Sequence, residues 1–497
     1  MIYLKQNEEL YNNDIRAMLQ AFFDNEKVSV KKEDTRLSLL VEYTPDSHTD
    51  MQTRVGKAVT FLLEDEAGYR DSRTVVTDFY DKKQARNPLK AALYHLLSAY
   101  TGHTLPWGSL TGVRPTKIAT ELLEQGQSDA EIRKVYTDTY LTIPQKAEIC
   151  IEVAKREQEL LQAYHYEEEY GIYIGIPFCP SRCLYCSFPS YSIEGYRDRV
   201  EDYLHALRRE IEFVASSEVY RQKRLVVVYV GGGTPSALSA GQLETLIAVI
   251  RQSFDFTYVR EFCVECGRPD SITPDKLHVL RQAGVGRISI NPQTMSDATL
   301  SLIGRAHTVE QTKEAFALAR QAGFTNINMD MIVGLPGEGM EEVAYTLSEL
   351  EKLKPDSLTV HSLALKRASN LKIELSRYQE LIRGSTNEML LAVDACARSL
   401  SLFPYYLYRQ KNIPGKLENI GYAAKGKECM YNILIMEEKL DILAMGAGAS
   451  SKFVFHRENR IERVENVKNV DAYMTRIDEM IERKRNMFLN VAAYERV

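Results

Sequence analysis

Between residues 171 and 360, short runs of β-branched and aromatic residues alternate with stretches that have the apolar spacing of helices. The six runs lie at 171–176, 225–230, 261–265, 287–290, 326–333 and 357–360. Strands that alternate with helices form βα units, and such units build a parallel sheet. The pattern therefore predicts an α/β protein, and it fits a doubly wound sheet as well as an incomplete barrel.

Two of the intervening helices have recognisable ends. Thr273 stands before a proline, as an N-cap residue does, and Gly284 follows the last apolar position. Thr308 has Gln311 three residues later, which is the pattern of a capping box, and Gly323 is placed to end that helix. These signals predict where the two helices begin and end.

The regions on either side follow other patterns. Toward the N-terminus we expect strands at 28–30 and 37–43, helices at 54–63, 88–100 and 143–164, and a loop at 105–117. Toward the C-terminus we expect helices at 376–402 and 468–485, and short strands at 431–436 and 440–444. We divide the chain into an N-terminal α/β accessory domain (1–165), a core (166–375) and an α-rich C-terminal domain (376–497).

Charge and hydropathy disfavour several classes of protein. The chain has 62 Lys and Arg against 68 Asp and Glu, a net charge of −6, which disfavours a protein that grips nucleic acid phosphates. No apolar run approaches the roughly 20 residues that span a bilayer, and the first residues lack a signal-peptide pattern. We expect a cytoplasmic protein with no nucleic acid partner and no membrane insertion.

Three of the eight cysteines, Cys179, Cys183 and Cys186, lie within eight residues directly after the first predicted strand. The spacing C-x-x-x-C-x-x-C lets three thiolates on one loop face a common point. A structural zinc ion takes four ligands, and no fourth is nearby. An iron–sulfur cluster bound by three cysteines leaves one iron open for a small ligand. We interpret Cys263 and Cys266 as small apolar residues at a buried strand end.

Polar residues and glycines gather where later strands end. The segment VGGGTP (230–235) allows the backbone to approach a ligand closely, or simply to turn tightly. Four polar residues accompany the later strands. Glu265 ends one predicted strand, Gln293 follows the next, Asp330 lies within another, and Arg305 lies in the segment IGRAHT. In parallel βα folds, ligands collect at the carboxyl ends of the strands. The sequence therefore predicts a ligand site at this edge.

The motifs together resemble the radical S-adenosylmethionine superfamily, whose hallmark is C-x-x-x-C-x-x-C after the first strand of a partial (βα)6 TIM-type barrel. They are, in family order, YIGIPFCPSRCLYCSF, VGGGTP, VECGRPD, INPQT, IGRAHT and MDMIVGLPGE. The fuller resemblance is to the oxygen-independent coproporphyrinogen III oxidase (dehydrogenase) family and its HemZ branch. That branch also has WGSLTGVRPTK, YYLYRQKN and LAMGAGAS.

The resemblance implies a role for each matching residue. Cys179, Cys183 and Cys186 would bind a [4Fe-4S] cluster whose open iron takes the amino and carboxylate groups of S-adenosylmethionine. Tyr173 would lie beside the sulfonium, as a catalytic and cofactor-binding residue. Further cofactor contacts would be Tyr185, Gly231, Gly232, Gly233, Thr234, Glu265, Gln293, Arg305, Asp330 and Ala364. The family is known to hold two S-adenosylmethionine molecules, so a second molecule is compatible with the resemblance.

The implied activity is the anaerobic oxidative decarboxylation of two propionates of coproporphyrinogen III to vinyl groups in haem biosynthesis. A 5′-deoxyadenosyl radical would take hydrogen from each propionate, and loss of CO2 and one electron would leave protoporphyrinogen IX. The partners would be this porphyrinogen and an unidentified electron donor and acceptor. Arg182 and Arg268 are candidates for binding the propionates.

Three departures from the better-known branch concern the second cofactor and the substrate. Gly175 replaces a histidine, Ser187 and Phe188 stand where that branch has a further cysteine, and Gly267 replaces an acidic residue. Three other functions are alternatives: a haem-binding or haem-transfer protein on the same core, an RNA-modifying radical enzyme, and a zinc-binding module. Gly175 in place of a histidine and the N-terminal segment disfavour the first, the net charge disfavours the second, and the third fails on ligand count.

Overall fold

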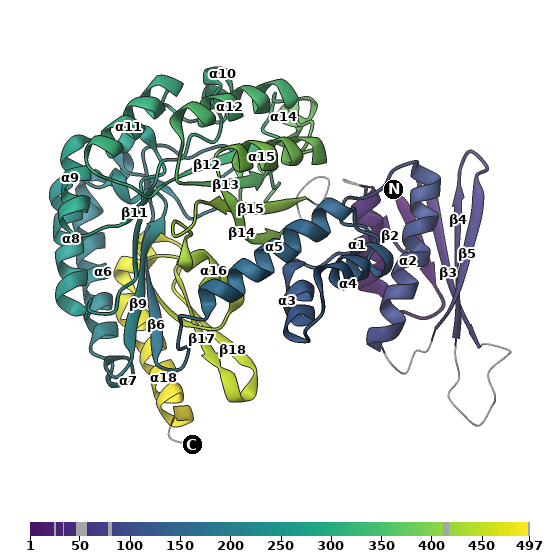
Figure 1. The fold of residues 1–497 in the computed structure, drawn as a ribbon, viewed down its shortest axis with the longest axis horizontal. Coiled ribbons are helices and arrows are strands. Elements are labelled where there is room, and N and C mark those ends of the chain that lie inside the picture. Colours follow the sequence, from purple (N-terminus) through teal and green to yellow (C-terminus); the bar gives the residue numbers. More distant parts are fainter. Residues whose placement is uncertain (24–25, 33, 46–56, 78–81, 411–416, 496–497) are drawn as a thin grey trace. The chain divides into compact units, whose positions relative to one another are not determined.

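The protein's computed structural model describes residues 1–23, 26–32, 34–45, 57–77, 82–410 and 417–495. The chain forms two compact units (Figure 1). The smaller combines Met1–Arg156 with Leu407–Glu418, and the larger combines Glu157–Tyr406 with Asn419–Val497. The division of the sequence at residues 165 and 375 stays a prediction.

The smaller unit is built on a five-stranded sheet with the order β2-β1-β3-β4-β5. Its strands are β1 (Ile2–Gln6), β2 (Val28–Ser29), β3 (Leu37–Pro45), β4 (Lys57–Asp65) and β5 (Arg70–Thr77). Helices α1 (Asn12–Phe22) and α2 (Lys82–Thr101) share one apolar core with this sheet. The remaining helices are α3 (Thr116–Glu124), α4 (Asp129–Lys134), a π-helical turn (Val135–Thr139) and α5 (Pro144–Leu161).

The helix that we expected at 54–63 is wrong for the described part of that range, which is strand β4. Val59, Phe61 and Leu63 are completely buried, whereas Thr60 and Leu62 between them are partly exposed. This alternation has the period of a strand, and β4 pairs with both β3 and β5. Residues 54–56 lie outside the described residues.

The larger unit contains an eleven-stranded sheet with the order β14-β15-β13-β12-β11-β10-β9-β6-β16-β17-β18. Six strands of this sheet are parallel, namely β6, β9, β10, β11, β12 and β13, and each pairs with the one that follows it in this series. They are β6 (Glu169–Ile176), β9 (Arg224–Gly232), β10 (Glu261–Glu265), β11 (Arg287–Ser289), β12 (Ile327–Val333) and β13 (Ser357–Ser362). All six predicted strands are confirmed, and they form the partial (βα)6 barrel that the motifs imply.

Helices connect these strands and cover one side of them, as Figure 1 shows for α8, α9 and α11. The connecting helices are α6 (Val200–Ala215), α7 (Glu218–Arg221), α8 (Ala240–Ser253), α9 (Pro274–Gln282), α10 (Asp297–Leu302), α11 (Val309–Gln321) and α12 (Met340–Leu353). Both predicted caps are confirmed. The Thr273 side chain accepts a hydrogen bond from the Lys276 backbone, and Thr308 and Gln311 form a capping box.

The C-terminal region adds strands and helices to this core. Its strands are β14 (Phe403–Arg409), β15 (Glu418–Ala423), β16 (Asp441–Met445), β17 (Ser450–Phe455) and β18 (Arg460–Glu465). Its helices are α13 (Asn370–Ile373), α14 (Leu375–Tyr378), α15 (Asn387–Ser399), α16 (Met430–Glu437), α17 (Val470–Thr475) and α18 (Ile477–Glu495). No helix in the described ranges has the length and apolar character needed to cross a bilayer.

The strand predicted at 440–444 is confirmed as β16, but the one predicted at 431–436 is wrong. That stretch is helix α16, whose backbone N–H groups of Met430 and Tyr431 donate to the carboxylate of Glu261 at 2.7 and 3.0 Å. Glu261 comes from β10, far away in sequence. A short apolar run does not distinguish strand from helix, so a tertiary contact decides.

Candidate active site

The cysteine loop follows β6 directly and is held by backbone hydrogen bonds to several parts of the larger unit. The Leu184 N–H donates to Ile303, and the Leu371 N–H donates to Leu184, at 2.9 and 2.8 Å. The Ile193 N–H donates to the Cys179 carbonyl at 2.9 Å. The loop is thus anchored on both sides of its thiols.

The three thiols are free and partly buried. Burial raises the pKa of Cys179 to about 11. The hydrogen bond that Thr234 Oγ1 donates to its sulfur at 3.3 Å lowers this pKa and offsets part of the effect. Burial also raises the pKa of Cys186. The charges of Cys183 and Cys186 raise the pKa of Cys179 further. A nearby cationic centre would stabilise these thiols as thiolates.

The arrangement fits a cluster better than a single ion. Among the residues described, no three His, Cys, Asp or Glu side chains surround one point as ligands of one metal ion. In a [4Fe-4S] cluster each thiolate binds a different iron, so Cys179, Cys183 and Cys186 need not converge on one atom. The chemistry of this donor set therefore fits the cluster.

The glycine loop packs directly against the start of the cysteine loop. Gly231 and Gly232 pair with Gly175 and Ile176 of β6. Gly232 has a φ of +109°, and a Cβ on Gly233 would lie 2.7 Å from the Phe178 carbonyl oxygen. The Gly233 N–H donates to the Ile176 carbonyl at the end of β6, and the Thr234 N–H donates to the Phe178 carbonyl just after it, both at 2.7 Å. Close backbone packing therefore requires glycine here, whatever ligand binds.

Glu265, at the end of β10, lies beside this loop. Tyr229 donates its hydroxyl to one carboxylate oxygen, and the Gly232 N–H donates to the other at 3.3 Å. Burial raises the pKa of Glu265 to about 7, the Tyr229 hydrogen bond lowers it, and the charge of Asp330 raises it. This edge of the sheet therefore holds a carboxyl group that titrates near neutral pH.

Three tyrosine rings lie nearly parallel beside Glu265. Ring centroids are 6.1 Å apart for Tyr173 and Tyr229, 5.9 Å for Tyr173 and Tyr431, and 4.2 Å for Tyr229 and Tyr431. Burial raises the pKa of Tyr173 well above its ordinary value. Sequence reasoning missed Tyr229 and Tyr431. The position of Tyr229, two residues before the glycines on β9, is a signal that could have found it.

Arg305 contacts the cysteine loop and the segments that follow β10 and β11. Its guanidinium donates to the carbonyls of Gly267 and Asn291, both at 2.7 Å, and to the Tyr185 hydroxyl at 3.2 Å. Because all three acceptors are uncharged or backbone groups, Arg305 does not form an ion pair with Glu265. Its Nε is buried and has no hydrogen-bond partner among the described residues.

The remaining predicted residues occupy the later strands. Gln293 has a φ of +69°, and its N–H donates to the Asp330 carbonyl at 2.9 Å. The Asp330 carboxylate accepts a hydrogen bond from Asn328 at 2.5 Å, and His361 Nε2 lies 3.9 Å away. Ala364 follows β13 and is partly exposed. Gln293 and Ala364 therefore follow the carboxyl ends of β11 and β13, whereas Asp330 lies within β12.

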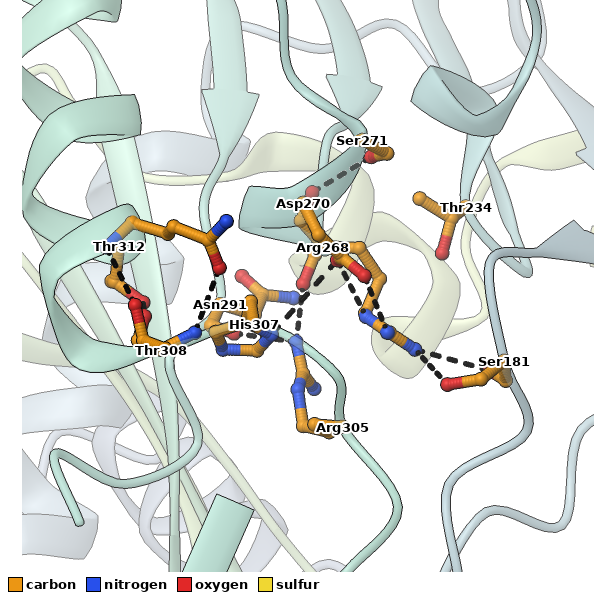
Figure 2. A network of polar contacts seen from close by, with 12 residues as sticks. Ser181, Thr234, Arg268, Asp270, Ser271, Asn291, Arg305, His307, Thr308 and Thr312 are labelled. Carbon is orange, nitrogen blue, oxygen red and sulfur yellow. Dashed lines mark hydrogen bonds and ion pairs between the residues drawn. The ribbon is translucent and has the colours of Figure 1, made fainter. Parts of the chain in front are cut away.

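Several buried polar atoms around this edge have no hydrogen-bond partner in the part of the chain that the structure describes. They are Ser289 Oγ, Asn291 Oδ1, Gln293 Oε1, Arg305 Nε and both ring nitrogens of His307. Figure 2 shows Asn291, Arg305 and His307 close together. Unpaired buried polar groups cost free energy and need an explanation, which a polar ligand would supply. The residues present therefore fit a cofactor with several hydrogen-bonding groups.

The two arginines that we expected to bind propionates differ in environment. Arg182 is exposed and donates to the Ala368 carbonyl at 2.8 Å. Arg268 is only 3% exposed and pairs through two nitrogens with Asp270 (Figure 2). Its guanidinium is engaged by groups of the chain, whereas that of Arg182 is exposed; both expectations stay predictions.

Comparison with known proteins places the chain in a family. The model of the radical SAM superfamily matches residues 173–350. The oxygen-independent coproporphyrinogen-III oxidase-like protein HemZ of Bacillus subtilis is 42% identical over 81% of this chain and 81% of that protein. The heme chaperone HemW of Lactococcus lactis is 30% identical over 63% of this chain and 78% of that protein.

A solved structure has the same fold. Coproporphyrinogen III oxidase (HemN) of Escherichia coli, described as a radical SAM enzyme, aligns with a TM-score of 0.50 at 24% identity. The alignment covers 65% of this chain and 73% of that one. Together with the HemZ relationship, these matches confirm the resemblance drawn from the motifs. The chain belongs to the radical SAM superfamily, which uses a [4Fe-4S] cluster and S-adenosylmethionine, and within it to the family of oxygen-independent coproporphyrinogen-III oxidase-like proteins.

Proposed function

We propose that this protein converts propionates of coproporphyrinogen III to vinyl groups without oxygen, using a [4Fe-4S] cluster held by Cys179, Cys183 and Cys186. The observation that carries the proposal is the position of three free thiols beside a sheet edge rich in unpaired buried polar atoms. The bound cluster and S-adenosylmethionine would supply the one-electron chemistry that breaks a propionate C–H bond. The similarity to HemZ supports the choice of substrate.

The residues of the chain would bind and orient the reactants. We assign cofactor contacts to Tyr173, Tyr185, Glu265, Gln293 and Arg305. We assign further contacts to Gly231, Gly232, Gly233, Thr234, Asp330 and Ala364. Ionised Glu265 suits the cofactor's ammonium group, because a buried carboxylate needs a charged or hydrogen-bonding partner. The parallel tyrosine rings would exclude water from the reacting atoms.

The balance of the reaction requires two electron partners. Each propionate loses one hydrogen atom, one further electron and CO2, while one electron enters at the cluster. We therefore propose an electron donor and a separate acceptor, and exposed Arg182 as a contact for a substrate carboxylate. A reducing cytoplasm suits a protein whose eight cysteines are all free.

A haem-transfer function is the second candidate, because the HemW relative is named a heme chaperone. Anaerobic reconstitution with iron and sulfide, followed by incubation with S-adenosylmethionine, dithionite, an artificial electron acceptor and coproporphyrinogen III, separates the two. We expect divinyl product together with 5′-deoxyadenosine and methionine. Stoichiometric haem binding with no vinyl product would instead support haem transfer.

A further inference from the structure

Arg268 joins the cysteine loop to the carboxylate of Asp270, whose side chain is 17% exposed. Its Nε and one terminal nitrogen donate to Asp270 at 3.0 and 2.8 Å. Its other terminal nitrogen donates to the carbonyl and hydroxyl oxygens of Ser181 at 3.1 and 3.0 Å, and lies 3.9 Å from the sulfur of Cys183. Figure 2 shows the guanidinium between Asp270 and Ser181.

The Arg268–Asp270 pair presents its positive group, and not its negative group, to the cysteine loop. Two of the three guanidinium nitrogens bind Asp270, and only the third contacts the cysteine loop. The positive group of the pair is therefore the one that contacts Cys183, while Asp270 lies on the opposite side of the guanidinium. Because Arg268 is only 3% exposed, solvent screens this charge weakly.

We infer that Arg268 is a positioning residue that raises the reduction potential of the cluster through its contact with Cys183, and that Asp270 moderates this effect. The inference rests on the proposed cluster site. Reduction adds a negative charge to a cluster, so a nearby cation favours the reduced form. Hydrogen bonds to the sulfurs and nearby charge are among the general determinants of cluster potentials.

The two partners should therefore act with opposite signs. Arg268→Met removes the cation and should make reduction about tenfold less favourable, a change of ~59 mV for one electron. Asp270→Asn leaves the guanidinium without its counter-charge and should shift the potential in the opposite direction. Arg268→Lys keeps the charge and should shift the potential less than Arg268→Met does.

The test is a redox titration of the reconstituted cluster, followed by electron paramagnetic resonance, with iron content measured for every variant. Arg182→Met is the matched control, since it removes an arginine whose side chain is exposed and which lies on the cysteine loop itself. We expect a smaller shift for this control than for Arg268→Met, because solvent screens an exposed charge.

Opposite shifts for Arg268→Met and Asp270→Asn, with iron content near wild type, would support the inference. Shifts in the same direction, no shifts, or an equal shift for Arg182→Met would overturn it. If Arg268→Met does not retain a cluster, Asp270→Asn decides the question: a raised potential supports the inference and an unchanged one overturns it. Wild-type protein that binds no cluster would overturn the proposed function, and the inference with it.

Discussion

The ring of Tyr431 stacks on that of Tyr229 at a centroid distance of 4.2 Å and an interplanar angle of 19°. Tyr229 in turn donates its hydroxyl to Glu265. A residue of helix α16 is thereby packed onto strand β9, beside the partly buried carboxyl group at the end of β10. The C-terminal region thus helps to form the environment of Glu265.

Tyr229→Phe should keep the stacked rings but remove the hydroxyl that donates to Glu265. Because this hydrogen bond lowers the pKa of Glu265, its loss should raise that pKa above about 7. S-adenosylmethionine binding at pH 7 should weaken and recover at higher pH. Isothermal titration across this pH range measures the effect. Tyr431→Phe is the control, since it leaves both hydrogen bonds of Glu265 in place, and an identical pH profile in the two variants would contradict the prediction.

Glu265 should also make folding stability depend on pH. Its pKa is raised from the ordinary 4.5 to about 7, so the folded protein keeps a proton that the unfolded chain releases between these values. The free energy of unfolding should therefore fall by roughly 3 kcal/mol from this group as pH rises from 4.5 to 7. Glu265→Gln should remove that contribution. Urea denaturation of both proteins at several pH values measures the difference, and parallel pH profiles would refute it.

Glu265→Ala should weaken S-adenosylmethionine binding about ten- to a hundredfold, because a charge-assisted hydrogen bond contributes roughly 1.5–3 kcal/mol. Iron content should remain near wild type, since the cysteines lie on a separate loop. Equilibrium binding to the folded, reconstituted variant is the measurement. An unchanged dissociation constant would show that Glu265 serves the fold and not the cofactor.

Replacing Cys179, Cys183 or Cys186 by alanine should remove most of the reconstituted iron and all cleavage of S-adenosylmethionine. Cys263→Ala and Cys266→Ala are matched controls, because both thiols are buried at 2% and 1% exposure. Burial raises the pKa of Cys266 to about 12, which keeps that thiol protonated and inert. Iron analysis and electron paramagnetic resonance measure the outcome. Loss of iron in a control variant, with iron retained in Cys183→Ala, would mean that the ligands are wrongly assigned.

Gly233→Ala should disturb the contact between the glycine loop and the cysteine loop. The added Cβ would lie 2.7 Å from the Phe178 carbonyl oxygen, so the backbone must shift, at a cost of about 1–3 kcal/mol. Gly241→Ala, on helix α8, is the control: its Cβ would meet no atom within 4 Å, and it should stabilise the protein by about 0.5–1 kcal/mol. Chemical denaturation of both variants tests this. Equal stability would contradict the packing described for Gly233.

Much of the fold and the cysteine motif were predictable because their signals are local. A strand buried on both faces must be apolar along its length, so 225–230 was recognisable as part of β9 (Arg224–Gly232). Thr308 and Gln311 interact within one helical turn, so their capping box is also readable from spacing. The three cysteines occupy one short loop, and their spacing alone brings them together.

Only the tertiary structure decided which distant groups meet. The range 430–437 is a helix because Glu261, distant in sequence, accepts hydrogen bonds from its first turn. Arg268 lies against Cys183 because Asp270 and Ser181, on separate segments of the chain, both bind its guanidinium. Burial raises the pKa of Glu265, and burial is a property of the packed chain. Local spacing determined the six core strands, the two helix caps and the cysteine loop, whereas non-local packing determined charge, orientation and hydrogen-bond partners.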